Sequence, residues 1–182
     1  NVLNVIYRSY AFSNGLISND EINEICELRR PMELVSVLFK IVAIKTPEIK
    51  RISSEDFFEL CKKNKRLKFV AISELLLSES YIKGAVTDQN LNALFGIDDY
   101  MFTWVVAFLK SDNYLKGYIT GENLREILSY DFIRFHIAVN TLTSAEYRLK
   151  VDARKKEEVK GLLDTDYKRE IYSFIEEERS LI

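Results

Sequence analysis

The chain repeats a pattern of apolar residues about every 34 positions, and this repeat restricts its fold more than any other feature. Four segments align without gaps. Each has an aliphatic residue followed at once by a hydroxyl residue, and further apolar residues lie eleven before and five and eight after the aliphatic. Repeats of this length are typical of stacked supersecondary units. The aliphatic–hydroxyl pairs are Ile17-Ser18, Ile52-Ser53, Val86-Thr87 and Ile119-Thr120, separated by 35, 34 and 33 residues.

Each repeat is predicted to be a helix, a loop and a second helix. The hydroxyl residue is a natural N-cap, because its oxygen can accept from the free backbone N–H groups of a first helical turn. Ser18 with Glu21 has the spacing of a capping box, and Ser53 with Asp56 has an acidic variant of it. The apolar residues after each cap recur at i and i+3, on one helical face. With only 6 glycines and 2 prolines in the chain, this pattern predicts an all-α fold.

Composition excludes some classes of function. The 182 residues suffice for one domain or two small ones, and the net charge of −2 gives no reason to expect a nucleic-acid partner. The densest apolar stretch, Phe102 to Leu109, is too short to span a membrane. Two cysteines do not make a disulfide framework, so we expect reduced thiols and a cytoplasmic protein.

The repeats resemble EF-hands, the helix–loop–helix units of calmodulin and myosin light chains. Gly15, Gly84 and Gly117 occupy the glycine position of the twelve-residue EF-hand loop, whereas the second repeat has Lys50 there. The resemblance covers roughly residues 1–135. It implies an N-terminal lobe over 1–68 with hands 1 and 2, and a C-terminal lobe over 69–135 with hands 3 and 4. A helical extension would follow over 136–182. It also implies that the aliphatics of each lobe pair in a short antiparallel bridge, Ile17 with Ile52 and Val86 with Ile119.

The ligand positions of these loops do not suit calcium. Ca²⁺ binds six to eight oxygens, and five loop positions should supply them from side chains. Lysine at such a position repels the ion, so we expect four degenerate hands with no bound calcium and no cofactor. The first hand departs least from the pattern. The five positions hold Tyr10, Phe12, Asn14, Ser18 and Glu21; Lys45, Pro47, Ile49, Ser53 and Asp56; Glu79, Tyr81, Lys83, Thr87 and Asn90; and Asp112, Tyr114, Lys116, Thr120 and Asn123.

A hand without metal can still bind a helix. A helix that is apolar on nearly every side must be covered on more than one face, and part of it could line a groove for a partner helix. With only two methionines, a particular partner is favoured over promiscuous binding. The expected groove residues are Ile41, Leu60, Trp104, Val105, Phe108 and Ile127.

We therefore expect a calcium-independent, calmodulin-like module that clasps an amphipathic helix of a partner or of its parent chain, not an enzyme. By resemblance it would be a light chain or a scaffold component of a cytoskeletal assembly. Two alternatives stay open: a regulatory domain within a larger enzyme such as a kinase or phospholipase, and a helical enzyme with carboxylates in a cleft. The spacing of Asp and Glu does not favour the second.

The C-terminal region carries two further signals. Thr143 with Glu146 predicts another helix start. Beyond it, Tyr167, Ile171, Phe174 and Ile175 share one helical face, and this stripe is predicted either to fill the groove from within or to bind a second protein. His136 is the only histidine, so zinc ligation is poorly supported.

Overall fold

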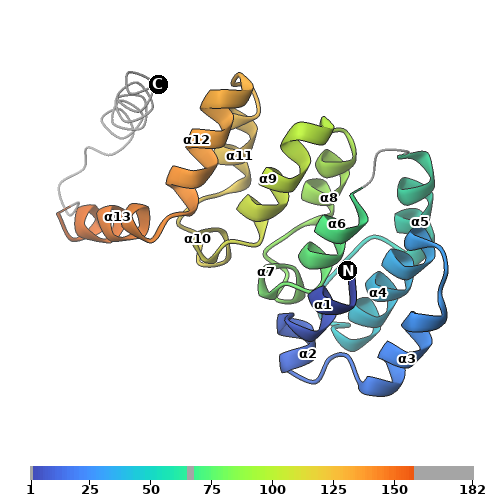
Figure 1. Cartoon of the computed structure of the whole chain (residues 1–182). Helices are drawn as coiled ribbons and strands as arrows, with labels where there is room; N and C mark the ends of the chain where they lie inside the picture. Colours follow the sequence, from blue (N-terminus) through green and yellow to red (C-terminus); the bar gives the residue numbers. More distant parts are fainter. Residues whose placement is uncertain (1, 65–67, 158–182) are drawn as a thin grey trace. The chain divides into compact units, whose positions relative to one another are not determined.

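The computed structural model of the chain describes residues 2–64 and 68–157 (Figure 1). These residues include helices, turns and bends but no strand, so the predicted all-α class is confirmed. The stripe predicted at Tyr167, Ile171, Phe174 and Ile175 lies outside the described residues. The helices are α1 (Val2–Tyr7), α2 (Tyr10–Ser13), α3 (Asn19–Glu27), α4 (Pro31–Lys45), α5 (Ser54–Lys63), α6 (Phe69–Leu76), α7 (Glu79–Ile82), α8 (Asp88–Phe95), α9 (Asp99–Leu109), α10 (Asp112–Leu115), α11 (Gly121–Ile127), α12 (Phe132–Thr143) and α13 (Ala145–Glu157).

The predicted caps begin the second helix of every repeat. Ser18, Ser53, Thr87 and Thr120 are the N-caps of α3, α5, α8 and α11, and each side-chain oxygen accepts a hydrogen bond from a backbone N–H of the first turn. The Ser18–Glu21 capping box is present, with the Glu21 carboxylate 2.8 Å from the Ser18 backbone nitrogen. The helix–loop–helix prediction therefore holds for all four repeats.

A second recurring element, which we call the serine corner, separates the first helix of a repeat from the next helix. It occurs at Ser9, Ser78, Ser111 and Ser144. Each serine donates its hydroxyl to the carbonyl three residues earlier, at 2.6–2.7 Å. An aromatic residue stands three positions after each serine. In three corners the backbone N–H of that aromatic donates back to the serine oxygen, at 3.1–3.3 Å. The aromatics are Phe12, Tyr81, Tyr114 and Tyr147.

The same corner recurs at Ser144, between α12 and α13, although the aliphatic position of the repeat holds Asp152 there. Ser144, not Thr143, accepts from the first turn of α13, whereas the Thr143 hydroxyl donates to the carbonyl of Val139 within α12. The predicted start at Thr143 is therefore wrong by one residue. The predicted boundary between residues 135 and 136 also cuts through α12, which spans Phe132–Thr143.

The length of the helix that follows each corner depends on whether a glycine ends it. Gly15, Gly84 and Gly117 have φ of 70°, 76° and 73°, a left-handed conformation that lets the short helices α2, α7 and α10 end after about one turn. After the corner at Ser144, the position 33 residues after Gly117 holds Lys150. Without a glycine stop, α13 continues to Glu157.

The second repeat departs from this plan at three positions. Ile44 stands where the other repeats have the corner serine, Pro47 where they have the aromatic, and Lys50 where three have glycine. Consequently α4 runs on to Lys45, no short helix follows it, and Lys50 does not adopt a positive φ. The loop at Lys50 therefore forms a different turn from the glycine turns of the other three repeats.

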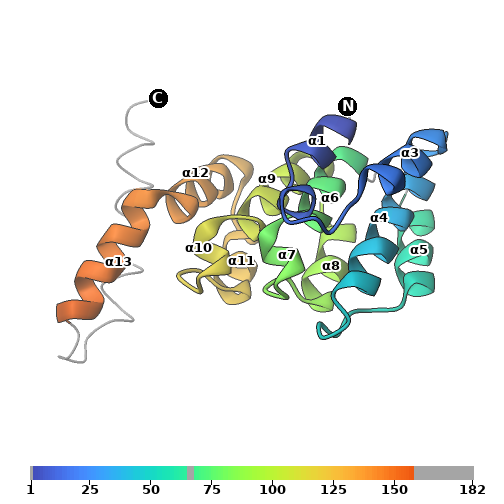
Figure 2. The ribbon, with the colours of Figure 1, turned by 90° about the horizontal axis from the view of Figure 1, so that it is seen from below.

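The chain forms two compact units, residues 1–111 and 112–182. In the first unit α6 packs against α1, α4 and α9, and both views show it beside all three helices (Figures 1 and 2). In addition, α5 packs on α4 and α8. Because α6 and α8 share their packing with the earlier helices, the predicted boundary between residues 68 and 69 falls inside this unit.

Aromatic contacts join the second and third repeats into one core. The rings of Phe39 and Phe57 stack with their centroids 4.1 Å apart, and Phe39 also contacts the buried Tyr81 ring at 6.4 Å. The edge of Phe95 contacts Phe57 at 6.0 Å. These residues come from α4, α5, α7 and α8. In the second unit, α12 packs against α10, α11 and α13.

The bridges implied by the EF-hand resemblance are absent from the described residues. Neither Ile17 and Ile52 nor Val86 and Ile119 form a bridge. The backbone N–H groups of Val86 and Ile119 donate within their own repeats, to the carbonyls of Ser80 and Asn113 at 3.3 Å. Ile17, Val86 and Ile119 are buried and Ile52 is half-buried, so these aliphatics act as core residues.

Candidate functional site

The predicted groove residues do not line one open groove. Val105, Phe108 and Ile127 are 1%, 0% and 3% exposed, so they are core residues of α9 and α11. Ile127 also belongs to the second unit, whereas the other five lie in the first. Ile41, Leu60 and Trp104 are half-buried. Of the predicted set, Ile41 lies in a longer apolar surface described below.

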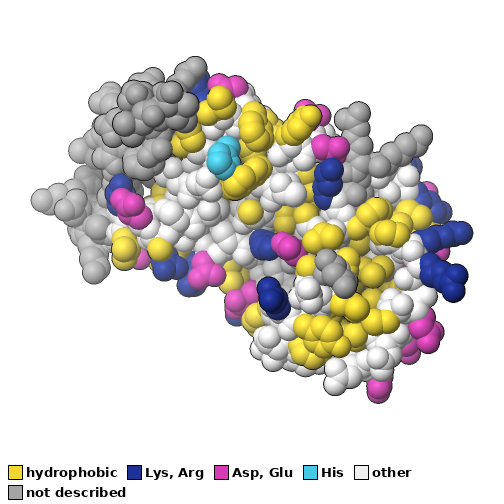
Figure 3. Space-filling model, viewed as in Figure 1, with side chains coloured by type: hydrophobic (Ala, Val, Ile, Leu, Met, Phe, Trp, Pro, Cys, Tyr) yellow, Lys and Arg dark blue, Asp and Glu magenta, His cyan; other side chains and the backbone are white. Residues whose placement is uncertain are grey.

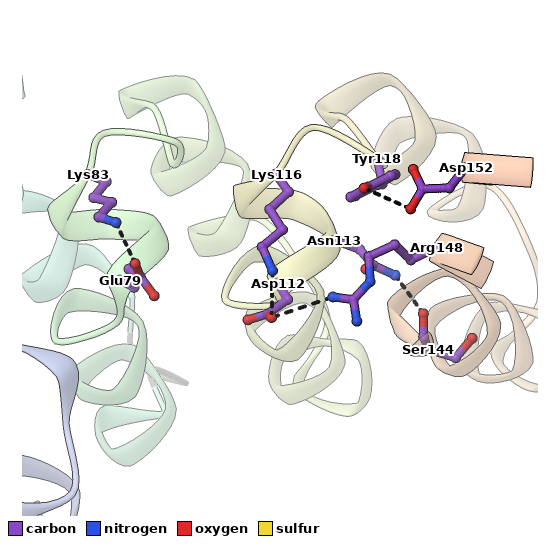
Figure 4. A network of polar contacts seen from close by, with 9 residues as sticks. All are labelled: Glu79, Lys83, Asp112, Asn113, Lys116, Tyr118, Ser144, Arg148 and Asp152. Atoms are coloured by element: carbon purple, nitrogen blue, oxygen red, sulfur yellow. Dashed lines mark hydrogen bonds and ion pairs between the residues drawn. The ribbon is translucent and has the colours of Figure 1, made fainter. Parts of the chain in front are cut away.

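Lysine ammonium groups lie beside the carboxylates of the third and fourth loops. Lys83 Nζ is 2.5 Å from Glu79 Oε1, and Lys116 Nζ is 3.2 Å from Asp112 Oδ2 (Figure 4). Each pair is separated by four residues, so the two side chains meet across one turn. The bond to Glu79 raises the pKa of Lys83. In both loops a cation of the chain itself neutralises the carboxylate that an ion would need.

The first loop also has its closing carboxylate engaged. Lys45 Nζ lies 2.7 Å from Glu21 Oε1 and 2.8 Å from Oε2, while Ser18 donates to the same carboxylate. Burial by itself would raise the pKa of Glu21, but the Lys45 and Ser18 hydrogen bonds outweigh it and lower the pKa. Within the described ranges, no three His, Cys, Asp or Glu side chains gather as a metal-binding group.

Arg51 fixes the loop of the second repeat to the third repeat. Its guanidinium donates to Thr46 Oγ1 at 2.6 Å and to the Tyr81 carbonyl at 2.8 Å, and it lies 4.6 Å from the centroid of the Tyr81 ring. Beside it, the Ile52 backbone N–H donates to Asp88 Oδ1 at 2.9 Å. Sequence reasoning missed Arg51, although it is the one charged residue directly before a central aliphatic; the other repeats have Leu16, Ala85 and Tyr118.

A polar network in the second unit holds α13 (Figure 4). The buried Asn113 amide donates to the carbonyls of Leu142 and Ser144, both at 2.8 Å. Arg148 reaches Asp112 at 3.7 Å, and the Tyr118 hydroxyl donates to Asp152 at 3.1 Å. These contacts join α10 and its loop to the end of α12 and to α13, so we assign them a structural role.

The strongest candidate for a binding surface is an apolar row along α4. Leu34, Val37, Ile41 and Ile44 are spaced by three, four and three residues, so they share one side of the helix. We call them the α4 row. None of the four is buried, and Ile44 is 65% exposed, although Val35, Leu38, Phe39 and Val42 on another side are fully buried in the core.

The first unit also has an apolar area over two of its helices. Figure 3 shows hydrophobic side chains gathered over α1 and α4 near the N-terminus, with Lys and Arg side chains along one edge. On α1, Tyr7 is 50% exposed. A continuous apolar area of this kind, bordered by charges, is typical of a protein-interaction surface.

A smaller apolar cluster marks the start of α12 in the second unit. Phe132 and Ile133 are 48% and 57% exposed, and the Phe132 ring stacks on His136 with centroids 6.4 Å apart. Figure 3 shows the single histidine bordered by hydrophobic side chains. This cluster was not predicted, and it covers about one helical turn, whereas the α4 row spans ten residues.

Comparisons of the chain with family models, with curated proteins and with solved structures find no match. No helix within the described ranges is long and apolar enough to cross a membrane.

Proposed function

We propose that the chain is a calcium-independent protein-interaction module that binds an amphipathic helix through the α4 row. The observation that carries this proposal is the double apolar character of α4. One side of the helix packs in the core, while Leu34, Val37, Ile41 and Ile44 remain accessible on another. A helix that is apolar on two sides calls for a second cover.

The geometry of the row suits a helix. From Leu34 to Ile44 the row spans ten residues, which is about 15 Å or roughly three turns. Amphipathic helices present anchors at i, i+3 or i+4 and i+7, the same spacing in which these side chains stand. Burying aliphatic side chains is the main favourable term in such contacts, at about 25 cal/mol per Å² of apolar surface removed from water.

The arrangement of the loops supports independence from calcium. The carboxylates of Glu21, Glu79 and Asp112 already hold Lys45, Lys83 and Lys116. Binding an ion would either break these ion pairs, which costs their Coulomb attraction, or place the ion beside the ammonium groups, which repel it. A cytoplasmic light chain or cytoskeletal scaffold component is the form of this function that the EF-hand resemblance suggests. A regulatory domain within a larger enzyme would use the same mode of binding.

Affinity capture with the full chain tests the proposal. We expect the same helical partner to be recovered in excess chelator and in millimolar Ca²⁺, and Ile44→Asp to abolish its recovery. The matched control is Leu149→Asp, because Leu149 on α13 is 66% exposed against 65% for Ile44. Circular dichroism verifies that both variants fold. Recovery that requires Ca²⁺, or no stable partner under either condition, would contradict the proposal.

A further inference from the structure

We propose that the second repeat has diverged into the docking site itself, and that the helix it binds carries acidic residues beside its apolar stripe. This inference rests on the proposed function and adds why the second repeat carries the site and what charge its partner has. It is drawn from the departures of the second repeat and from the charges around α4.

The first step concerns the missing serine corner. At each of the four serine corners the hydroxyl donates to a carbonyl of the helix that ends there, and all four serines are half-buried. Ile44 cannot make that bond, so α4 continues to Lys45 and ends with the Thr46 backbone N–H bonded to Val42. The substitution lengthens the apolar row at its end and replaces a satisfied polar group with an exposed aliphatic one.

Exposure of Ile44 is not needed to build the core. The loop after it is held by Arg51 and Thr46, and the neighbouring Val42 fills the interior. Ile44 is 65% exposed at a position where other repeats have serine. It therefore does not contribute to the packing of the core. It adds the last anchor of a row that a partner helix can cover.

The second step concerns charge. The stretch from Arg29 to Lys45 contains four basic residues and one acidic residue, a net charge of +3 in a chain whose net charge is −2. Glu33 is paired with Arg30 and Lys45 with Glu21. Arg29 and Lys40 are exposed and have no acidic partner among the described residues.

The position of Lys40 places this charge beside the row. Lys40 lies three residues after Val37 and four before Ile44, so it stands next to both on the helix surface. Arg29 and Arg30 precede the first turn of α4, at the other end of the row. A docked helix with Glu or Asp flanking its apolar stripe would meet these cations, whereas a basic helix would be repelled.

A selection with displayed peptides on the full chain tests the inference. The library is a 15-residue helix with leucine at positions 1, 4, 8 and 11, and with Glu, Gln or Lys allowed at the flanking positions. We expect selection of Glu at the flanks. Fluorescence anisotropy should then show the Glu-flanked peptide binding about threefold to tenfold more tightly than the Lys-flanked one, as a few exposed charge pairs provide. The difference should shrink at 0.5 M salt.

Variants of the chain identify the site. Ile44→Asp should weaken binding of the Glu-flanked peptide by at least about tenfold, consistent with losing a buried aliphatic anchor. Leu149→Asp should leave it unchanged. Lys40→Glu should reverse the flank preference while retaining binding of the leucine stripe.

Several results would overturn the inference: no selection of any peptide, no flank preference, a preference for Lys, or binding that ignores Ile44→Asp. A concentration-dependent dimer in sedimentation that Ile44→Asp dissociates would assign the row to a second copy of the chain instead. If affinity capture recovers a partner that Ile44→Asp abolishes, but the displayed peptides show no preference for Glu at the flanks, the proposed function stands and only this inference fails.

Discussion

At each serine corner one hydroxyl group connects two helices. It donates to a carbonyl of the helix that ends and, at Ser9, Ser78 and Ser144, accepts from the first turn of the next. The helix termini that it joins have backbone groups with no intrahelical partner. A serine that makes both hydrogen bonds therefore ends one helix and is the N-cap of the next.

Ser78→Ala tests this role in the middle of the first unit. The variant loses the bond to the Leu75 carbonyl, 2.6 Å long, and the one from the Tyr81 N–H. We expect the free energy of unfolding to fall by about 1 kcal/mol, the usual value of an N-cap hydroxyl. Urea denaturation measures it, with Ser13→Ala as the control because Ser13 is exposed at the end of α2. An equal effect of the two substitutions would refute the role of the corner.

Glu21 gives a prediction in pH. Its pKa is lowered in the folded chain from an ordinary value of 4.5, so its ion pair with Lys45 stabilises the fold above that value. The contribution is lost as the pH falls from about 4.5 through the lower folded pKa. Glu21→Gln keeps a capping side chain but removes the charge. We expect it to cost about 0.5 kcal/mol at pH 7, and progressively less as the pH falls below 4.5. A difference independent of pH would contradict the ion pair.

At the scale of the element, the turn after each short helix depends on glycine for two separate reasons. Gly15 and Gly84 both have positive φ, but they differ in their surroundings. A Cβ at Gly15 would meet nothing within 4 Å, whereas a Cβ at Gly84 would lie 3.0 Å from Ile49 Cδ1 in the loop of the second repeat. The pair therefore separates backbone strain from packing between repeats.

We expect Gly15→Ala to cost about 1 kcal/mol from the left-handed conformation alone. Gly84→Ala should cost roughly 1 kcal/mol more, because Ile49 must shift. In urea denaturation, Gly84→Ala made in the Ile49→Ala background should lose that extra part and cost about as much as Gly15→Ala. If the two glycine variants are equally destabilised, the loops of the second and third repeats do not pack as described.

The sequence predicted some elements well because their signals are local. A hydroxyl residue before an apolar i, i+3 pattern specifies a capped helix, and all four such helices form. The serine corners escaped notice because an EF-hand alignment assigns those positions outside the twelve-residue loop. A search for serine followed three residues later by an aromatic finds all four corners, but it also finds Ser36 with Phe39, Ser54 with Phe57 and Ser129 with Phe132, so this signal alone does not identify them.

Contacts between helices that are far apart in the sequence could not be predicted in the same way. The spacing of Ile17 and Ile52 shows that two repeats are alike but not which repeat each one packs against. The structure places α6 against α1 and α4 together, through buried residues such as Ile72 and Leu75. The contact of Arg51 with Tyr81 spans 30 residues and depends on a loop that only the second repeat has. Similarly, Val105 and Phe108 are buried because other helices pack against α9, and the sequence does not show which helices these are.

At the scale of the whole molecule, the repeats have the same capped helices but expose different side chains at the corner position. Four corner positions hold a hydrogen-bonded serine, and the corner position of the second repeat holds an exposed isoleucine. The resulting α4 row is the feature that links the repeat plan to a function. Its proposed partner, an amphipathic helix, needs no metal to be recognised.

The central claim is that the loops are fixed turns with internal cations and not calcium sites. Titration calorimetry of the full chain with Ca²⁺ tests it most directly. The account predicts only heats of dilution up to millimolar Ca²⁺, with no change in thermal unfolding. Saturable uptake at micromolar Ca²⁺ that disappears in Glu21→Gln would contradict it, because the Glu21 carboxylate would then be holding an ion and not Lys45.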